Sequence, residues 1–185
     1  MWELGIPHVT IIAGKSPEAT TLVRAVERAE DLGMIAGVRA CGSVLGRGTL
    51  IRDLARAGVD HLNVLYLAAD AGRHDSLAGV GGHEQAIRAF GLARENEVCP
   101  VAEIALTRAT AAVVDDTIRS LKQHGVETAA LFALASTAEM APGNASDAAL
   151  AGDALIQVAG TVADTADAAD VRVLWYPPVG LQPGS

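Results

Sequence analysis

With 185 residues, half of them hydrophobic, the chain is long enough to bury one sizeable core, and no break in composition marks a second domain. Fourteen basic against 22 acidic residues give a net charge of -8 without any cluster of Lys and Arg. This balance argues against nucleic acid and against an anionic membrane surface as partners. Cys41 and Cys99 lie far apart in sequence and are predicted to be buried thiols rather than a disulfide. With no basic leader and no long apolar run, we expect one domain over residues 1–185, located in the cytoplasm.

Short runs rich in Val, Ile and Leu alternate with amphipathic stretches along the chain. This alternation is typical of parallel strands joined by crossover helices, which place functional groups at the carboxyl ends of the strands. The runs that predict strands are residues 8–13, 35–40, 60–67, 100–106, 127–134 and 171–176. The stretches that predict helices are residues 17–32, 50–58, 83–97, 110–124 and 147–166. Two polar connections predict loops, at residues 68–82 and 136–146.

Two glycine-containing stretches resemble phosphate-binding loops without matching one. Gly14-Lys15-Ser16 follows a strand, but a phosphate-binding loop needs a glycine five residues earlier, where this chain has Val9. Residues 79–82 are rich in glycine, yet Glu84 stands where a dinucleotide turn requires its third glycine. We therefore expect no nucleotide site. The five histidines lack metal-ligand spacing, so no metal site is predicted either.

Two polar features are candidates for a ligand site. Arg73-His74-Asp75 is the densest polar cluster after a predicted strand, and it would bind an anion or assist proton transfer if it is not a solvated loop. Glu103 lies in the middle of an apolar strand. A carboxylate that faces a barrel interior is costly unless it is paired or functional, whereas one at a strand edge points to solvent.

The segment from His8 to about residue 135 resembles the catalytic barrel of the radical SAM superfamily. The resemblance lies in the order of elements and in four phrases: the Gly-x-x-Pro turn at residues 14–17, and residues 54–64, 74–79 and 118–126. It implies an α/β fold of parallel strands and outer helices, a partial TIM-type (β/α)6 barrel. It also implies chemistry in which a 4Fe-4S cluster and S-adenosylmethionine (SAM) generate a deoxyadenosyl radical.

The chain departs from that family at the residues that hold both cofactors. The family binds its cluster through three cysteines in a CxxxCxxC loop, whereas this chain has two cysteines in all. Gly14-Lys15-Ser16-Pro17 replaces Gly-Gly-Glu-Pro, so a positive charge stands where a carboxylate would meet the SAM ammonium. Leu65 and Leu67 replace polar residues that would contact the ribose, and Ala40-Cys41-Gly42 replaces a Thr-Asn-Gly strand end.

We therefore expect a radical-SAM-like domain without its own cluster site, either degenerate or part of a larger SAM-dependent radical enzyme. SAM and a 4Fe-4S cluster are expected only if an upstream segment exists. An open barrel side predicts a homodimer or a partner protein that covers it. One alternative is a barrel enzyme with a late phosphate site, although no glycine-rich loop follows residue 134. The other is a non-catalytic module that binds a small molecule or a peptide through side chains at strand ends, namely Ser16, Cys41, Asp70, Arg73, His74 and Glu103.

Overall fold

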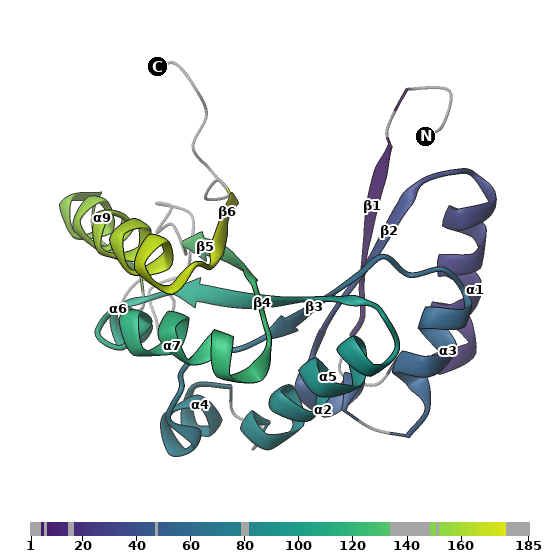
Figure 1. The fold of residues 1–185 in the computed structure, drawn as a ribbon, viewed down its shortest axis with the longest axis horizontal. Coiled ribbons are helices and arrows are strands. Elements are labelled where there is room, and N and C mark those ends of the chain that lie inside the picture. Colours follow the sequence, from purple (N-terminus) through teal and green to yellow (C-terminus); the bar gives the residue numbers. More distant parts are fainter. Residues whose placement is uncertain are drawn as a thin grey trace, which may run out of the picture.

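The computed structural model describes Gly5 and residues 7–14, 17–46, 48–78, 82–133, 149–150 and 152–176. Its centre is a parallel six-stranded sheet whose strands follow one another in chain order from β1 to β6. Figure 1 shows that the sheet is strongly curved and that the labelled helices lie around its outside. The predicted α/β partial barrel is therefore confirmed. The strands are β1 (His8–Ile12), β2 (Ile35–Cys41), β3 (His61–Leu65), β4 (Cys99–Leu106), β5 (Thr128–Ala133) and β6 (Arg172–Tyr176).

The helices connect successive strands on the outer face of the sheet (Figure 1). They are α1 (Ala19–Asp31), α2 (Gly42–Leu45), α3 (Leu50–Arg56), α4 (Ala71–Ala78), α5 (His83–Glu95), α6 (Arg108–Ala111), α7 (Val114–Leu121), the 3-10 turn η2 (Lys122–His124) and α9 (Gly152–Ala169). None of the helices in the described residues is long and apolar enough to span a bilayer.

The hydrophobic core lies between the outer face of the sheet and the helices. Because side chains alternate along a strand, every second residue points outward. Val38, Val64, Ile104 and Leu131 are such residues, and all four are fully buried in the core. Alanines at many core positions let the helices approach the sheet closely, which explains how a chain with 3% aromatic residues builds this layer.

Two predicted segments differ from the observed ones. The predicted loop at residues 68–82 contains α4, whose start is held by Asp70, because its carboxylate accepts a hydrogen bond from the Arg73 N–H at 2.7 Å. The predicted helix 110–124 is divided into α6, α7 and η2. Thr107 and Thr110 form a capping box, so α6 begins before residue 110, and the chain turns again at Val113 before α7 begins. The predicted loop at residues 136–146 lies outside the described residues.

Large apolar side chains are exposed at both ends of the curved sheet. Ile12 and Ile35 lie at the β1 side, with exposed fractions of 69% and 52%. Leu174, Trp175 and Tyr176 lie on β6, with exposed fractions of 40–45%. Edges of this kind are where another chain adds in many proteins, so they are the relevant surfaces for the expected homodimer or partner.

Candidate functional site on the inner face of the sheet

The inner face of the sheet carries a row of polar and aromatic side chains that crosses five strands. Their positions follow from the register, because Arg39 pairs with Asn63, and Leu65, two residues further along β3, pairs with Glu103. Their sequence neighbours Val38, Val64 and Ile104 face the helices, so these side chains face the opposite way. The members of this inner-face cluster are Arg39 on β2, Asn63 on β3, Glu103 on β4, Phe132 on β5 and Tyr176 on β6.

An ion pair forms the centre of the inner-face cluster. Arg39 Nε donates to Glu103 Oε2 at 2.5 Å, which joins β2 to β4 across the intervening strand. The Glu103 side chain is 3% exposed, while that of Arg39 is 35% exposed. The guanidinium carbon of Arg39 also lies 5.2 Å from the centre of the Phe132 ring, a cation-π distance. Burial raises the pKa of Glu103, and the hydrogen bond and charge of Arg39 act against that shift.

Asn63 lies beside this pair and is almost fully buried, with 2% of its surface exposed. Its Nδ2 donates to the Tyr176 hydroxyl at 3.4 Å, a long and weak bond, and its Oδ1 has no partner among the described residues. If the amide were turned by 180°, Oδ1 would accept from the Tyr176 hydroxyl and Nδ2 would be the unpaired atom, so one polar atom of Asn63 is unpaired in either orientation. A buried amide with an unmade hydrogen bond costs stability, so it marks a position where a ligand group would be favourable.

Histidines occupy the amino-terminal half of the same face. The His61 ring lies against His8, with ring centres 5.0 Å apart, and fills the space above Gly37. A Cβ at Gly37 would stand 2.1 Å from the ring, so only glycine fits there without displacing it. Burial is the main cause that lowers the pKa of His61, and the neighbouring His8 adds to it. The His61 side chain is therefore uncharged near pH 7 and borders the inner face.

The structure brings together two of the side chains predicted to bind a ligand. Cys41 and Glu103 both pair with Leu65 and lie on the inner face, two strands apart. The Cys41 thiol contacts the Ser43 hydroxyl at 3.0 Å and is half-buried. Both cysteines are free thiols, but Cys99 is exposed, so the prediction that it is buried is wrong. Ser16 lies outside the described residues, so its place relative to this face stays a prediction.

The other three predicted side chains belong to the start of α4, on the helical side of the sheet. Asp70 caps that helix, and Arg73 is exposed. His74 is 2% exposed and packs against Tyr66 and His83 in the outer layer, with ring centres 5.8 and 5.4 Å away. Burial lowers the pKa of His74, with the His83 charge adding to the shift. His74 therefore does not meet Glu103, because the sheet lies between them.

Sequence reasoning missed Arg39 and Asn63. Each is one polar residue inside an apolar strand, the same signal that singled out Glu103. The sequence could not give the register of the strands, which sets Arg39 beside Asn63 and lets the Arg39 side chain reach Glu103. The polar residue that interrupts an apolar strand is a useful signal when neighbouring strands carry complementary ones.

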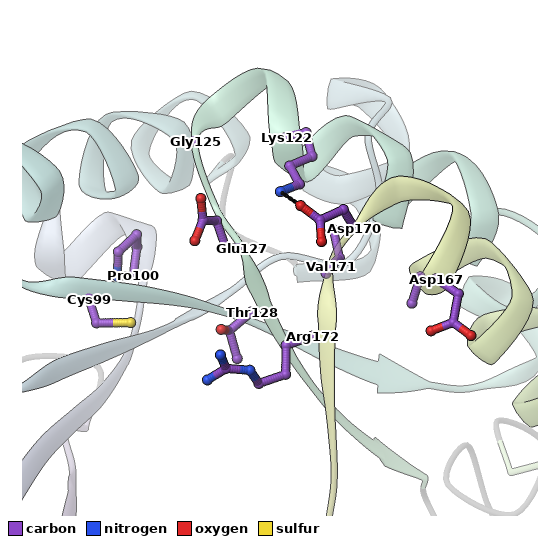
Figure 2. Close-up of a pocket in the computed structure, with 11 residues that line it drawn as sticks. Cys99, Pro100, Lys122, Gly125, Glu127, Thr128, Asp167, Asp170, Val171 and Arg172 are labelled. Atoms are coloured by element: carbon purple, nitrogen blue, oxygen red, sulfur yellow. Dashed lines mark hydrogen bonds and ion pairs between the residues drawn. The ribbon is translucent and has the colours of Figure 1, made fainter.

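A hollow that we call the amino-end pocket opens at the amino ends of the strands. It has a volume of about 480 Å³ and includes Cys99, Thr128 and Arg172, the first residues of β4, β5 and β6. Figure 2 shows Arg172 reaching toward Thr128, and the Lys122–Asp170 ion pair at the rim. Functional sites of parallel barrels lie at the carboxyl ends of strands, so this pocket is on the opposite side.

The thiols of this chain do not fit a 4Fe-4S cluster. Cys41 pairs with Leu65 and Cys99 pairs with His61, four residues earlier on β3. At the rise of a strand, the two thiols are roughly 13 Å apart along the sheet. The described residues also contain no group of three His, Cys, Asp or Glu side chains placed to hold a metal ion. Three thiolates around one cluster therefore cannot come from this chain.

The comparisons with known proteins find the same fold among solved structures. No protein-family model and no curated protein sequence matches the chain. A domain of pyruvate-formate lyase-activating enzyme from Bacteroides vulgatus has a TM-score of 0.63 and 15% identity, over 91% of this chain and 98% of that one. SuiB from Streptococcus suis has a TM-score of 0.70 and 11% identity, over 92% of this chain and 39% of that one.

The parallel half-barrel of this chain is therefore a fold that these two proteins also have, in agreement with the fold that the sequence resemblance implies. The citrate synthase SbnG also matches, with a TM-score of 0.59 and 15% identity, over 95% of this chain and 70% of that one. At these identities the likeness is one of fold, and a shared fold does not carry a shared reaction. The chain spans about two fifths of the length of SuiB.

Proposed function

We propose that this chain is a radical-SAM-like half-barrel that binds a small ligand on its inner face and holds no iron-sulfur cluster with its own side chains. The observation that carries the proposal is the inner-face cluster, in which a buried ion pair lies beside an unpaired amide. Polar groups in a concave apolar setting are the usual composition of a small-molecule site. The inner face also lies on the side of the sheet away from the helices (Figure 1).

A structural role alone explains this cluster poorly. The Glu103 carboxylate is 3% exposed, and removing such a charge from water costs several kcal/mol, whereas well-packed apolar side chains of similar volume commonly give equal or greater stability. Asn63 adds a second cost, because its amide makes one long bond and leaves one atom unpaired. Costs of this kind are typical of sites that are built for a ligand.

Anaerobic reconstitution with iron and sulfide tests the part of the proposal that concerns the cluster. The matched control is the double variant Cys41→Ser, Cys99→Ser, which has no thiols. We expect the two proteins to bind the same small amount of iron and sulfide after desalting. A full cluster on the wild-type chain that is missing from the double variant would overturn the proposal.

A second candidate function is that the chain is one part of a larger SAM-dependent radical enzyme. The observation that favours it is the length of SuiB, since this chain covers only 39% of that radical SAM enzyme. In that case the cluster would be held by residues outside this chain. Formation of 5′-deoxyadenosine from SAM by the purified chain, or by any longer protein that contains it, is the measurement that separates the two candidates.

The expected homodimer or partner protein stays a prediction. It rests on the apolar side chains exposed at the two sheet edges, Ile12 on β1 and Trp175 on β6. Light scattering on the purified chain gives the mass in solution, and substitution of Trp175 by Lys tests whether this edge is involved. A monomer at all concentrations in both proteins would contradict the expectation.

A further inference from the structure

We infer that the ligand of the inner face is an α-amino acid in its zwitterionic form, with a short apolar side chain. This inference rests on the proposed ligand-binding function and specifies its substrate class. The residues that carry it are Arg39, Asn63 and Glu103, which provide a cation, an unpaired amide oxygen and an anion within three neighbouring strands.

The charges of the site match a ligand that has one charge of each sign. Arg39 and Glu103 cancel each other, so a net-charged ligand would leave one buried charge without compensation. A zwitterion keeps the total neutral and gives each charged side chain a second partner. The carboxylate would lie on Arg39, and the ammonium would lie between Asn63 and Glu103.

The donors and acceptors are arranged for the same ligand. Nε of Arg39 bonds to Glu103, so the two terminal nitrogens of the guanidinium are the ones that a carboxylate would meet. In the amide orientation of the structure, Asn63 Oδ1 is a buried acceptor with no described partner, and an ammonium N–H would satisfy it. A ligand without such a donor would leave that oxygen unpaired. In the exchanged orientation, the unpaired Nδ2 would instead donate to the ligand carboxylate, so a zwitterion satisfies either orientation.

The spacing of the strands agrees with groups attached to one carbon atom. Arg39 and Asn63 are register partners on adjacent strands, which lie about 4.8 Å apart. Side chains on such neighbouring positions can contact an amino group and a carboxylate joined by a single carbon. Glu103, on the strand beyond Asn63, is placed to share the ammonium.

Apolar residues border this cluster on the same face. Leu65 lies between Cys41 and Glu103 in the register, and Phe132 lies under the Arg39 guanidinium. Leu174 pairs with Ala130, which pairs with Glu103, and it is 41% exposed. A branched aliphatic side chain would cover this surface, whereas a charged one would bring an unmatched charge to it.

Binding also requires a way to the buried amide. Arg39 has a long flexible side chain that is 35% exposed, and Tyr176 at the rim is 40% exposed. Tyr176 contacts the amide directly, and the 3.4 Å bond from Asn63 to its hydroxyl is weaker than the 2.5 Å bond between Arg39 and Glu103. A shift of Tyr176 exposes the amide without breaking the ion pair.

Isothermal titration calorimetry with L-leucine and two matched analogues tests the inference. Isocaproate has the same carbon skeleton without the amino group, and isoamylamine has it without the carboxylate. We expect L-leucine to bind, and each analogue to bind at least about tenfold more weakly, because each loses a charged hydrogen bond.

Three variants connect the binding to the inner face. Arg39→Lys keeps the charge that pairs with Glu103 but loses the fork of donors, and Asn63→Leu removes the acceptor. Both are expected to weaken L-leucine binding at least about tenfold. Lys122→Gln, in the amino-end pocket, is expected to bind as the wild type does. Circular dichroism of each variant checks that it is folded.

The outcomes separate this inference from the proposed function. If isocaproate or isoamylamine binds as tightly as L-leucine and depends on Arg39 or Asn63, the ligand is a simple anion or amine. The amino-acid inference is then wrong, while the inner face is still a ligand site. Failure of all three compounds to bind overturns the inference, and the iron and sulfide measurement still decides the cluster separately. Equal binding by the Asn63→Leu protein also overturns it.

Discussion

The inner-face cluster and the amino-end pocket each pair a cation with a carboxylate, but they differ in what surrounds the pair. In the cluster, the Glu103 side chain is 3% exposed and has Arg39 as its partner. In the pocket, Lys122 meets Asp170 at 2.9 Å, but the Asp170 side chain is 98% exposed. Water therefore screens the attraction between Lys122 and Asp170, whereas the attraction between Arg39 and the buried Glu103 is screened much less.

The comparison teaches that the size of a hollow and the chemistry of a site are separate properties. The amino-end pocket has the volume, about 480 Å³, while the inner-face cluster has the buried charges and the unpaired amide. A ligand gains most where polar groups have already lost their water, because no further desolvation is needed there. The inner face is therefore the better candidate for a ligand site.

The largest effect is expected from Arg39→Met. This change leaves the Glu103 carboxylate buried without its partner, and the free energy of unfolding should fall by about 3 kcal/mol near pH 8. Burial already raises the pKa of Glu103, so loss of Arg39 raises it further. A group with a raised pKa stabilises the fold at low pH and loses that contribution as pH rises. The difference in unfolding free energy between the wild type and Arg39→Met should therefore become smaller as the pH is lowered toward about 5.

Urea unfolding at the two pH values measures this effect. Glu103→Gln is the matched variant, and it should cost less, because the partly exposed Arg39 can turn to solvent. Equal losses for the two single variants would contradict the asymmetry of burial on which the comparison rests.

The second effect has the opposite sign. Asn63→Leu replaces a buried amide that has an unpaired oxygen with an apolar side chain of similar size. We expect the free energy of unfolding to rise by about 1 kcal/mol while binding of L-leucine is lost. Thermal unfolding followed by circular dichroism measures the first part. A destabilised Asn63→Leu protein would show that the amide serves the fold.

The third effect concerns pH and the histidines. Burial lowers the pKa of His61, His74 and His124, so the folded chain takes up protons less readily than the unfolded chain does. Their contribution to stability is fully present above the unfolded value of about 6.5 and is lost as pH falls below it. The melting temperature should therefore fall as the pH decreases below about 6.5.

His74→Leu tests the share of this drop that comes from the helical layer. The variant should show a shallower dependence of melting temperature on pH, because one buried titrating group is gone. Identical slopes for variant and wild type would exclude His74 as a source of the pH dependence.

The smallest effect is expected in the amino-end pocket. Lys122→Gln removes a pair whose carboxylate lies in solvent, so the melting temperature should stay within error of the wild type. Differential scanning calorimetry at low and high salt measures this. A melting temperature that is clearly lower for Lys122→Gln at low salt but not at high salt would show that the Lys122–Asp170 attraction is stronger than the exposure of Asp170 indicates.

The sequence alone was enough to predict the fold. Alternating apolar runs and amphipathic stretches predicted six strands in parallel order, because a local pattern of burial sets each element. Capping side chains moved several helix boundaries. Asp70 starts a helix where polar composition predicted a loop, and Thr107 starts α6 before the predicted helix. Such hydrogen bonds depend on backbone positions that composition does not reveal.

The sequence determined that this chain is a parallel half-barrel with two thiols and with a carboxylate at Glu103 inside an apolar strand. Only the tertiary structure decided which side chains meet. It set Arg39 and Asn63 beside Glu103 and left His74 on the other side of the sheet. The physical reason is that strand register and the face of each side chain depend on pairing between distant segments, and a one-residue shift reverses every side chain.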